Sequence, residues 1–98
     1  ICSDIRALLA GNKLTAEDIA VIVPHQANKR IIDLAAARLA IPAEKFYINI
    51  QNYGNTSSAS IPIALDELNR SGRLQRGALV ILTAFGGGLS NASCIIRW

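Results

Sequence analysis

The side chains that could do chemistry stand in three short stretches of the chain. His25, the only histidine, lies in PHQAN, and Asn55 lies in NYGNTSSAS. An imidazole N–H and an amide N–H can both donate hydrogen bonds to an oxygen that gains negative charge during a reaction. The third stretch, AFGGG, holds consecutive glycines, whose backbone N–H groups can approach a ligand closely. Together the stretches predict a site that stabilises an oxyanion.

Each stretch also has a structural interpretation. His25 can be a structural histidine at the start of a helix, and Asn55 can simply cap a helix. Gly86 to Gly88 can form a flexible turn, and their spacing differs from the GxGxxG pattern of a dinucleotide site. The small residues from Thr56 to Ser60 favour the functional interpretation, because they leave room for a substrate beside Asn55.

Helices and strands are expected to alternate along the chain. The hydrophobic patterns predict helices over residues 3–11, 26–40 and 56–71, and strands over residues 19–23, 46–50, 79–83 and 93–97. Such alternation indicates an α/β fold: a mainly parallel sheet covered by helices, with an antiparallel final strand. Because the loops at the carboxyl ends of parallel strands converge, the three stretches are expected to meet at one edge of the sheet.

Two helices carry more specific predictions. In the helix over residues 26–40, Ala27, Ile31, Leu34, Ala35 and Leu39 are predicted to face inward, while Gln26, Lys29, Arg30 and Asp33 form a polar face. In the helix over residues 56–71, Pro62 predicts a kink or a distorted first turn.

The composition limits the class of protein. The 98 residues allow one domain, and 51% hydrophobic against 17% charged residues predicts apolar surface that packs against a missing partner. The net charge of +3 favours an acidic partner, whereas scattered basic residues and few aromatic residues argue against nucleic acid. No apolar run reaches the length of a membrane span. Cys2 and Cys94 match no metal or disulfide pattern, which favours a cytoplasmic setting.

PHQAN, GNTSSAS and AFGGG, in this order and spacing, resemble the C-terminal part of β-ketoacyl-acyl carrier protein synthase III, a condensing enzyme of the thiolase superfamily. The resemblance covers essentially the whole chain. It implies that residues 1–98 form the C-terminal half of a thiolase-like fold, with the N-terminal half of the subunit absent. A first residue, Ile1, that is not Met agrees with this expectation.

The resemblance implies a role for each site residue. His25 and Asn55 match the catalytic residues that bind the thioester carbonyl of malonyl-acyl carrier protein and stabilise the enolate left by carbon dioxide. Gly87 matches the glycine whose N–H holds the acyl oxyanion, and Phe85 and Asn28 are expected to line the substrate pocket. The implied reaction is the decarboxylative Claisen condensation of fatty acid biosynthesis. No cofactor is expected, because the substrates themselves carry coenzyme A or phosphopantetheine.

The resemblance also implies partners. Arg30 and Arg38 match positions that dock the acidic acyl carrier protein, whereas Ala37 departs from the basic pair seen in some members. The alternative for Arg30 is a solvated side chain paired with Asp33. The family's homodimer is expected as well. Its nucleophilic cysteine lies in the N-terminal half, so the 98 residues alone are expected to be inactive, and Cys94 is predicted to be a buried structural thiol.

Other functions stay open. Related enzymes that load polyketide starters share the arrangement, and a non-catalytic module that only binds a carrier protein would need the basic helix alone. A cysteine hydrolase built from Cys2, His25 and Asn55 has suitable residue types. It is disfavoured, because no local feature would activate Cys2.

Overall fold

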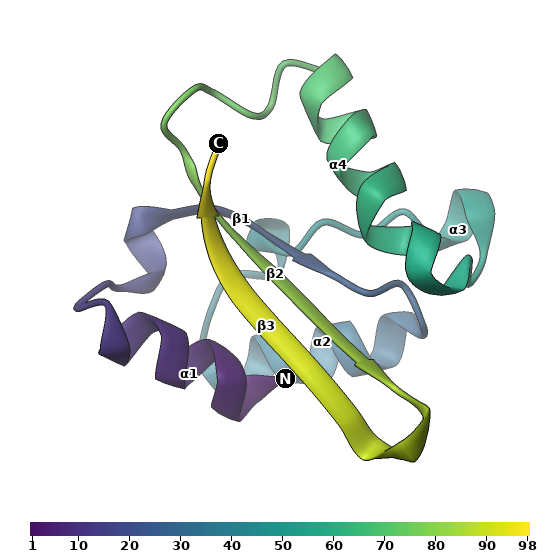
Figure 1. Cartoon of the computed structure of the whole chain (residues 1–98), viewed down its shortest axis with the longest axis horizontal. Helices are drawn as coiled ribbons and strands as arrows, with labels where there is room; N and C mark the ends of the chain where they lie inside the picture. Colours follow the sequence, from purple (N-terminus) through teal and green to yellow (C-terminus); the bar gives the residue numbers. More distant parts are fainter.

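The strands form a three-stranded mixed sheet in the order β1-β2-β3. The computed structural model describes residues 1–98, except for the side chain of Leu89. Strand β1 (Ile19–Pro24) pairs in parallel with β2 (Leu79–Gly86), and β2 pairs antiparallel with β3 (Ser90–Arg97) (Figure 1). The α/β fold with a parallel pair and an antiparallel final strand is therefore confirmed.

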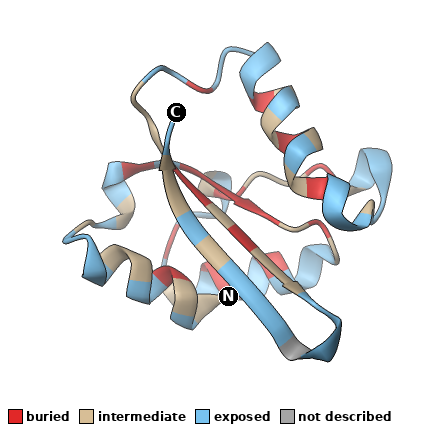
Figure 2. Cartoon of the chain, in the orientation of Figure 1, coloured by how far each residue is buried: buried red, intermediate tan, exposed pale blue. Residues whose placement is uncertain are grey.

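Helices cover both faces of this sheet. Helices α1 (Cys2–Gly11) and α2 (Lys29–Leu39) lie on one side, and α4 (Ser60–Arg70) lies on the other (Figure 1). The short helix α3 (Ile50–Tyr53) precedes α4. Strands β1 and β2 are buried between the helical layers, whereas β3 and its turn are largely exposed (Figure 2).

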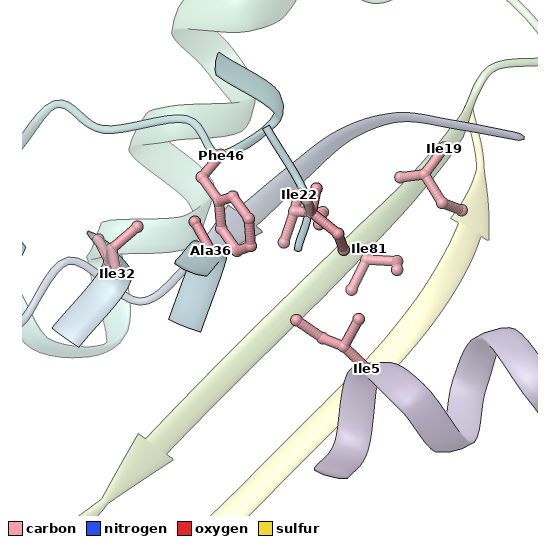
Figure 3. Packing of buried hydrophobic residues seen from close by; sticks show 8 residues of the cluster. Ile5, Ile19, Ile22, Ile32, Ala36, Phe46 and Ile81 are labelled. Atoms are coloured by element: carbon pink, nitrogen blue, oxygen red, sulfur yellow. The ribbon is translucent and has the colours of Figure 1, made fainter. Parts of the chain in front are cut away.

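Each face of the sheet has its own hydrophobic cluster, because successive side chains of a strand point to opposite faces. On the side of α1 and α2, Ile22 and Ile81 pack with Ile5, Ile32 and Phe46 (Figure 3). On the other side, the buried residues are Val21, Val23, Ala64, Leu68, Leu74 and Val80. Both clusters hold the carboxyl ends of β1 and β2 in place, where the polar loops begin.

The predicted inward face of α2 was partly wrong. Its buried residues are Ile32, Ala35 and Ala36, while Ile31 and Leu34 are 39% and 53% exposed. The sequence contains two apolar stripes at helical spacing, and the stripe with two small alanines packs inward. Ile32 and Ala36 pack in the cluster with Ile22 and Phe46, and α2 also contacts α1, so this stripe is the covered one.

The predicted strand over residues 46–50 was also wrong. Phe46 makes only an isolated parallel bridge with Ile22, and the chain then turns into α3. The Tyr47 N–H donates to the Ile22 carbonyl over 2.9 Å, but the next donor of a parallel ladder would come from Pro24, which has no N–H. The ladder therefore stops at this proline.

The side chain of Gln26 makes the hydrogen bonds that continue the contact between the two segments beyond the end of the ladder. Its Nε2 donates to the carbonyls of Pro24 and Tyr47 over 2.9 and 3.0 Å, and its Oε1 accepts from the Asn49 N–H over 3.0 Å. Gln26 is 1% exposed, so its predicted place on a polar surface was wrong. The glutamine amide acts in place of a backbone peptide and joins the loop after β1 to residues 47–49.

Several boundaries differ from the predictions. Helix α2 begins at Lys29 rather than residue 26, because Asn28 caps it. The first residues of the predicted helix form a 3₁₀ turn, Ser57–Ala59, while Pro62 falls in the first turn of α4, where a proline is tolerated. None of the helices in the described part of the chain has the length and apolar character that crossing a bilayer requires.

Candidate active site

A cleft of about 720 Å³ opens beyond the carboxyl ends of β1 and β2. It brings together four of the predicted site residues, His25, Asn55, Phe85 and Gly87. The other described residues that line it are mostly small: Ala27, Ser57, Ser58, Ser60, Ile61, Ala84 and Gly86. The predicted convergence of the three loops is therefore present in the structure, and small side chains leave the cleft open.

His25 is held from three directions. Its backbone N–H donates to the Thr83 carbonyl over 2.8 Å, which extends the pairing of β1 with β2 by one residue. Its ring atom Nδ1 lies 2.6 Å from Oγ of Ser60. The ring of Phe85 meets the imidazole edge-on, with centroids 5.8 Å apart. The remaining ring nitrogen, Nε2, is the one available to a ligand.

Asn55 is positioned by an unusual turn. Gly54 precedes it with φ 70° and ψ −158°, a backbone conformation that essentially only glycine adopts. The side-chain Oδ1 of Asn55 accepts a hydrogen bond from the Ser57 N–H over 2.9 Å, and Ser57 itself has a positive φ of 54°. Within the described residues the Nδ2 amide group has no hydrogen-bond partner. The side chain thus offers donors, which suits an oxyanion.

Phe85 lies near the end of β2, and Gly87 begins the glycine-rich turn that joins β2 to β3. Gly86, Gly87 and Gly88 are exposed, and Gly88 has φ 78°, which favours glycine at that position. Phe85 lines the active-site cleft and also a neighbouring hollow of about 430 Å³ formed with Ile31 and Leu34. Its ring therefore separates the histidine from the exposed apolar side of α2.

The basic residues lie on α2, outside the cleft. Asp33 pairs with Lys29 over 2.7 Å, so the predicted alternative partner of Arg30 is engaged elsewhere. Arg30 and Arg38 are both exposed, and the carbonyl of Arg38 accepts from the Arg6 guanidinium over 2.9 Å. The helix therefore presents arginines to solvent, as a docking surface requires.

The structure does not bring Asn28 into the cleft. Asn28 is exposed, and its side-chain Oδ1 accepts from the Arg30 N–H over 2.8 Å. This hydrogen bond caps the first turn of α2. No substrate contact is assigned to Asn28.

Neither cysteine belongs to the cleft lining that the structure describes. Cys2 lines the neighbouring hollow, and its Sγ lies 3.9 Å from the Ala35 carbonyl. Cys94 is exposed, so its predicted burial was wrong: side chains of β3 at this position face solvent rather than a helical layer. The hydrogen bonds of the described residues pair His25 with Ser60 and not with Cys2. The geometry therefore gives no support to the hydrolase alternative.

Sequence reasoning missed a group of residues that hold the loop before Asn55. The carboxylate of Glu67, on α4, accepts hydrogen bonds from Asn49 Nδ2 over 2.7 Å, from the Tyr53 hydroxyl over 2.9 Å and from the Tyr47 hydroxyl over 3.0 Å. This network, with Gln26, fixes residues 47–53 against α4. No local motif marks these residues, because their partners are distant in the sequence.

The Glu67 network makes stability depend on pH. The hydrogen bond from Asn49, followed by that from Tyr53, holds the pKa of Glu67 below its ordinary value. Because the pKa of Glu67 is lower in the folded chain than in the unfolded chain, the ionised carboxylate stabilises the folded state. This stabilisation is complete above the ordinary carboxylate pKa and is lost as the pH falls through the lowered pKa of the folded state. We expect the free energy of unfolding to fall more steeply below about pH 4 in the wild type than in Glu67→Gln. Urea titrations at several pH values measure this, and parallel curves for the two proteins would refute it.

The same network predicts the opposite behaviour in alkali. Burial, followed by the hydrogen bond to Glu67, raises the pKa of Tyr47, and the hydrogen bond to Glu67 raises that of Tyr53. The stabilisation of the folded state by the two protonated tyrosines is complete below the ordinary tyrosine pKa. It is lost as the pH rises through the raised pKa values of Tyr47 and Tyr53.

The cleft suits stabilisation of negative charge on oxygen. Among its described lining residues, His25 is the only titratable side chain, and the other polar groups are an amide, serine hydroxyls and backbone N–H groups. No carboxylate in this lining would oppose an anion. Uncharged, fixed donors in an otherwise small-residue cleft are the arrangement that stabilises an enolate or a tetrahedral oxyanion.

Comparisons with known proteins identify the family of the chain. Residues 9–98 match the family described as 3-Oxoacyl-[acyl-carrier-protein (ACP)] synthase III C terminal. The chain is 50% identical over 96 residues to the β-ketoacyl-[acyl-carrier-protein] synthase III of Clostridium acetobutylicum, covering 98% of this chain and 30% of that protein. It is 55% identical over 85 residues to that of a Roseiflexus species, covering 87% and 26%.

Solved structures share the fold. The 3-oxoacyl-[acyl-carrier-protein] synthase III of Aquifex aeolicus superposes with a TM-score of 0.95 at 45% identity, covering 99% of this chain and 32% of that one. That of Thermus thermophilus gives a TM-score of 0.92 at 46% identity, covering 98% and 30%. The chain thus spans less than a third of the length of these relatives. It belongs to the 3-oxoacyl-[acyl-carrier-protein] synthase III family and corresponds to the C-terminal domain of its thiolase-like fold.

Proposed function

We propose that this chain supplies the condensation site of a 3-oxoacyl-[acyl-carrier-protein] synthase III subunit, whose N-terminal part provides the nucleophilic cysteine. The observation that carries the proposal is the placement of His25 and Asn55 on one open cleft, where the hydrogen bonds of His25 Nδ1 and Asn55 Oδ1 leave Nε2 and Nδ2 as the donors. These two donors can bind one oxygen from the substrate.

The proposed reaction begins with an acyl group bound as a thioester to a cysteine outside this chain. A malonyl thioester, carried by acyl carrier protein, enters the cleft, and its carbonyl oxygen accepts hydrogen bonds from His25 and Asn55. Breaking the bond to the carboxylate releases carbon dioxide and leaves its electron pair in an enolate, whose oxygen the two donors stabilise. The enolate carbon then attacks the acyl carbonyl carbon, and the cysteine leaves as a thiolate.

Gly87 is proposed to stabilise the second anion of this sequence. When the enolate carbon attacks, the acyl carbonyl oxygen becomes an oxyanion, and a backbone N–H can hold it. Gly87 lines the cleft beside Phe85. Phe85, with its edge-on contact to the imidazole, is proposed to limit how His25 can move and to keep that side of the cleft apolar.

The chemistry needs no cofactor, because the thioester itself activates the substrate and carbon dioxide is the leaving group. Acyl-coenzyme A is proposed as the acyl donor and acyl carrier protein as the carrier of the malonyl group. A homodimer in the cytoplasm is proposed for the intact subunit. The exposed side chains of Ile31 and Leu34 are apolar surface available for packing against the rest of that subunit.

A hybrid subunit tests the proposal. In it, this chain replaces the corresponding C-terminal segment of the Clostridium acetobutylicum relative, with which it shares 50% identity. We expect the hybrid to form the 3-oxoacyl product from an acyl-coenzyme A and malonyl-acyl carrier protein. A hybrid that folds and becomes acylated, but makes no product, would contradict the proposed function.

Carrier docking is proposed to use the exposed arginines of α2. Because Asp33 pairs with Lys29, the Arg30 side chain is free to meet an acidic carrier protein. We expect Arg30→Glu in the hybrid to raise the KM for malonyl-acyl carrier protein about tenfold, a loss of about 1.4 kcal/mol of binding, with an effect that shrinks in high salt. The KM for acyl-coenzyme A should change little.

Arg76→Glu is the matched control for Arg30→Glu. Arg76 is also exposed, but it precedes the start of β2, at the opposite end of that strand from the cleft. Equal effects of the two charge reversals would show that only net charge matters. An Arg30→Glu variant with an unchanged KM for the carrier would remove α2 from the docking surface.

A further inference from the structure

We propose that Ser60 is a positioning residue for His25: its hydroxyl donates to Nδ1 and thereby keeps the ring proton on Nε2, the nitrogen available to the cleft. The consequence for catalysis rests on the proposed function. The hydrogen-bond direction itself rests on geometry alone and can be tested without any assay of activity.

The contact between the two side chains is short, and its serine partner is buried. Ser60 Oγ lies 2.6 Å from His25 Nδ1, and Ser60 is 3% exposed. Ser60 is the first residue of α4, so the helix fixes its backbone. On the other side, the hydrogen bond from the His25 N–H to the Thr83 carbonyl fixes the histidine. Both partners are therefore held by regular structure rather than by a mobile loop.

Hydrogen-bond satisfaction decides which atom donates. If Nδ1 carried the proton, it would donate to Oγ, and the hydroxyl proton of Ser60 would need another acceptor. Within the described residues, the Ser60 hydroxyl has Nδ1 as its hydrogen-bond partner and no other. A buried hydroxyl without an acceptor is costly, so the arrangement with the hydroxyl donating and Nδ1 accepting is favoured.

This direction assigns a role to each ring nitrogen of the neutral histidine. With Nδ1 accepting, the proton lies on Nε2, and the hydrogen bond made by one nitrogen determines the state of the other. Nε2–H is then a donor before any substrate arrives. A histidine prepared in this way stabilises a carbonyl oxygen that becomes an enolate, and it does not begin the reaction as a base.

Nitrogen NMR tests the assignment directly, because His25 is the only histidine of the chain. The 98-residue chain is labelled with ¹⁵N at histidine, and long-range ¹H–¹⁵N correlations are recorded at a pH where imidazole is neutral. We expect a pyridine-type signal for Nδ1, shifted by a hydrogen bond, and a pyrrole-type signal for Nε2. A pyrrole-type Nδ1 would overturn the proposal.

Two substitutions of Ser60 isolate its hydroxyl. In Ser60→Ala we expect the Nδ1 signal to lose its hydrogen-bond shift and both nitrogens to move toward the average of two tautomers. Ser60→Cys keeps a side chain of similar size but has a weaker hydrogen-bond donor, so it should shift the Nδ1 signal in the same direction. If one of the two variants fails to fold, the other still tests the proposal. Signals unchanged in both folded variants would overturn the proposal.

Ser58→Ala is the matched control. Ser58 also lines the cleft with a hydroxyl, but its side chain is exposed and is not the partner of Nδ1. We expect the imidazole signals of this variant to match those of the wild type. The spectra are repeated in the hybrid subunit, where the signals lost in His25→Gln identify the ring.

Kinetics in the hybrid separate this inference from the proposed function. We expect Ser60→Ala to lower kcat for condensation about ten- to a hundredfold, the range found for partners that orient ligating histidines, with a smaller change in KM. If Ser60→Ala alters the spectra but His25→Ala leaves condensation intact, the hydrogen bond stands and the proposed function fails. If His25→Ala abolishes condensation while Ser60→Ala changes neither spectra nor kcat, only the role of Ser60 fails.

Discussion

Replacing His25 by alanine in the hybrid subunit is expected to slow condensation about 100- to 1,000-fold, the range for the loss of one preorganised donor to an oxyanion. Asn55→Ala should cost about 100- to 1,000-fold, as the loss of one oxyanion donor does. Acyl transfer from acyl-coenzyme A to the cysteine should continue in both variants, because neither side chain is proposed to act on that step. Steady-state product formation and the rate of self-acylation measure the two steps separately.

Asn69→Ala serves as the control for Asn55→Ala. Asn69 is exposed near the far end of α4, so its loss should leave both steps unchanged. Condensation at the wild-type rate in both His25→Ala and Asn55→Ala would remove these residues from the reaction. Equal loss of acylation and condensation would indicate a general defect of the fold.

Gln26→Ala is expected to have the largest effect on stability. The substitution leaves the carbonyls of Pro24 and Tyr47 and the N–H of Asn49 without their buried partner. A buried polar group that loses its hydrogen bond costs about 1–3 kcal/mol, so three such groups predict a loss of about 3 kcal/mol or more in the free energy of unfolding. Urea unfolding of the 98-residue chain measures it.

Gln51→Ala is the matched control for this experiment. Gln51 is exposed, and its side chain makes a single hydrogen bond of 3.3 Å to the Ile48 carbonyl. Its loss should change the free energy of unfolding by no more than about 0.5 kcal/mol. A Gln26→Ala variant as stable as Gln51→Ala would show that water replaces the glutamine amide without cost.

The three loops of the site could be predicted from the sequence because each follows from a local signal. A strand that ends at a proline, a glycine next to Asn55 and a run of glycines all mark the ends of elements. Parallel pairing of β1 and β2 then places His25 and Phe85 at one edge. The convergence in the cleft is therefore a consequence of topology, which the alternation of helices and strands had indicated.

What could not be predicted depends on contacts between distant residues. Gln26 was assigned to a helix surface, and its burial follows only when Tyr47 and Asn49 lie beside Pro24. Helical spacing fits both apolar stripes of α2, and only the structure shows that the stripe with Ile32, Ala35 and Ala36 is the buried one. The partnership of Ser60 with His25 joins residues 35 positions apart. Such pairs become visible only in three dimensions.

The most direct test of the central claim is the intact mass of the hybrid subunit during the reaction. Wild type and His25→Ala are each incubated with an acyl-coenzyme A, which should add one acyl group to both. Malonyl-acyl carrier protein is then added. We predict that the wild type returns to its unmodified mass as the acyl group is consumed, while His25→Ala stays acylated. Loss of the acyl group from His25→Ala as fast as from the wild type, with formation of product, would contradict the assignment of this cleft as the condensation site.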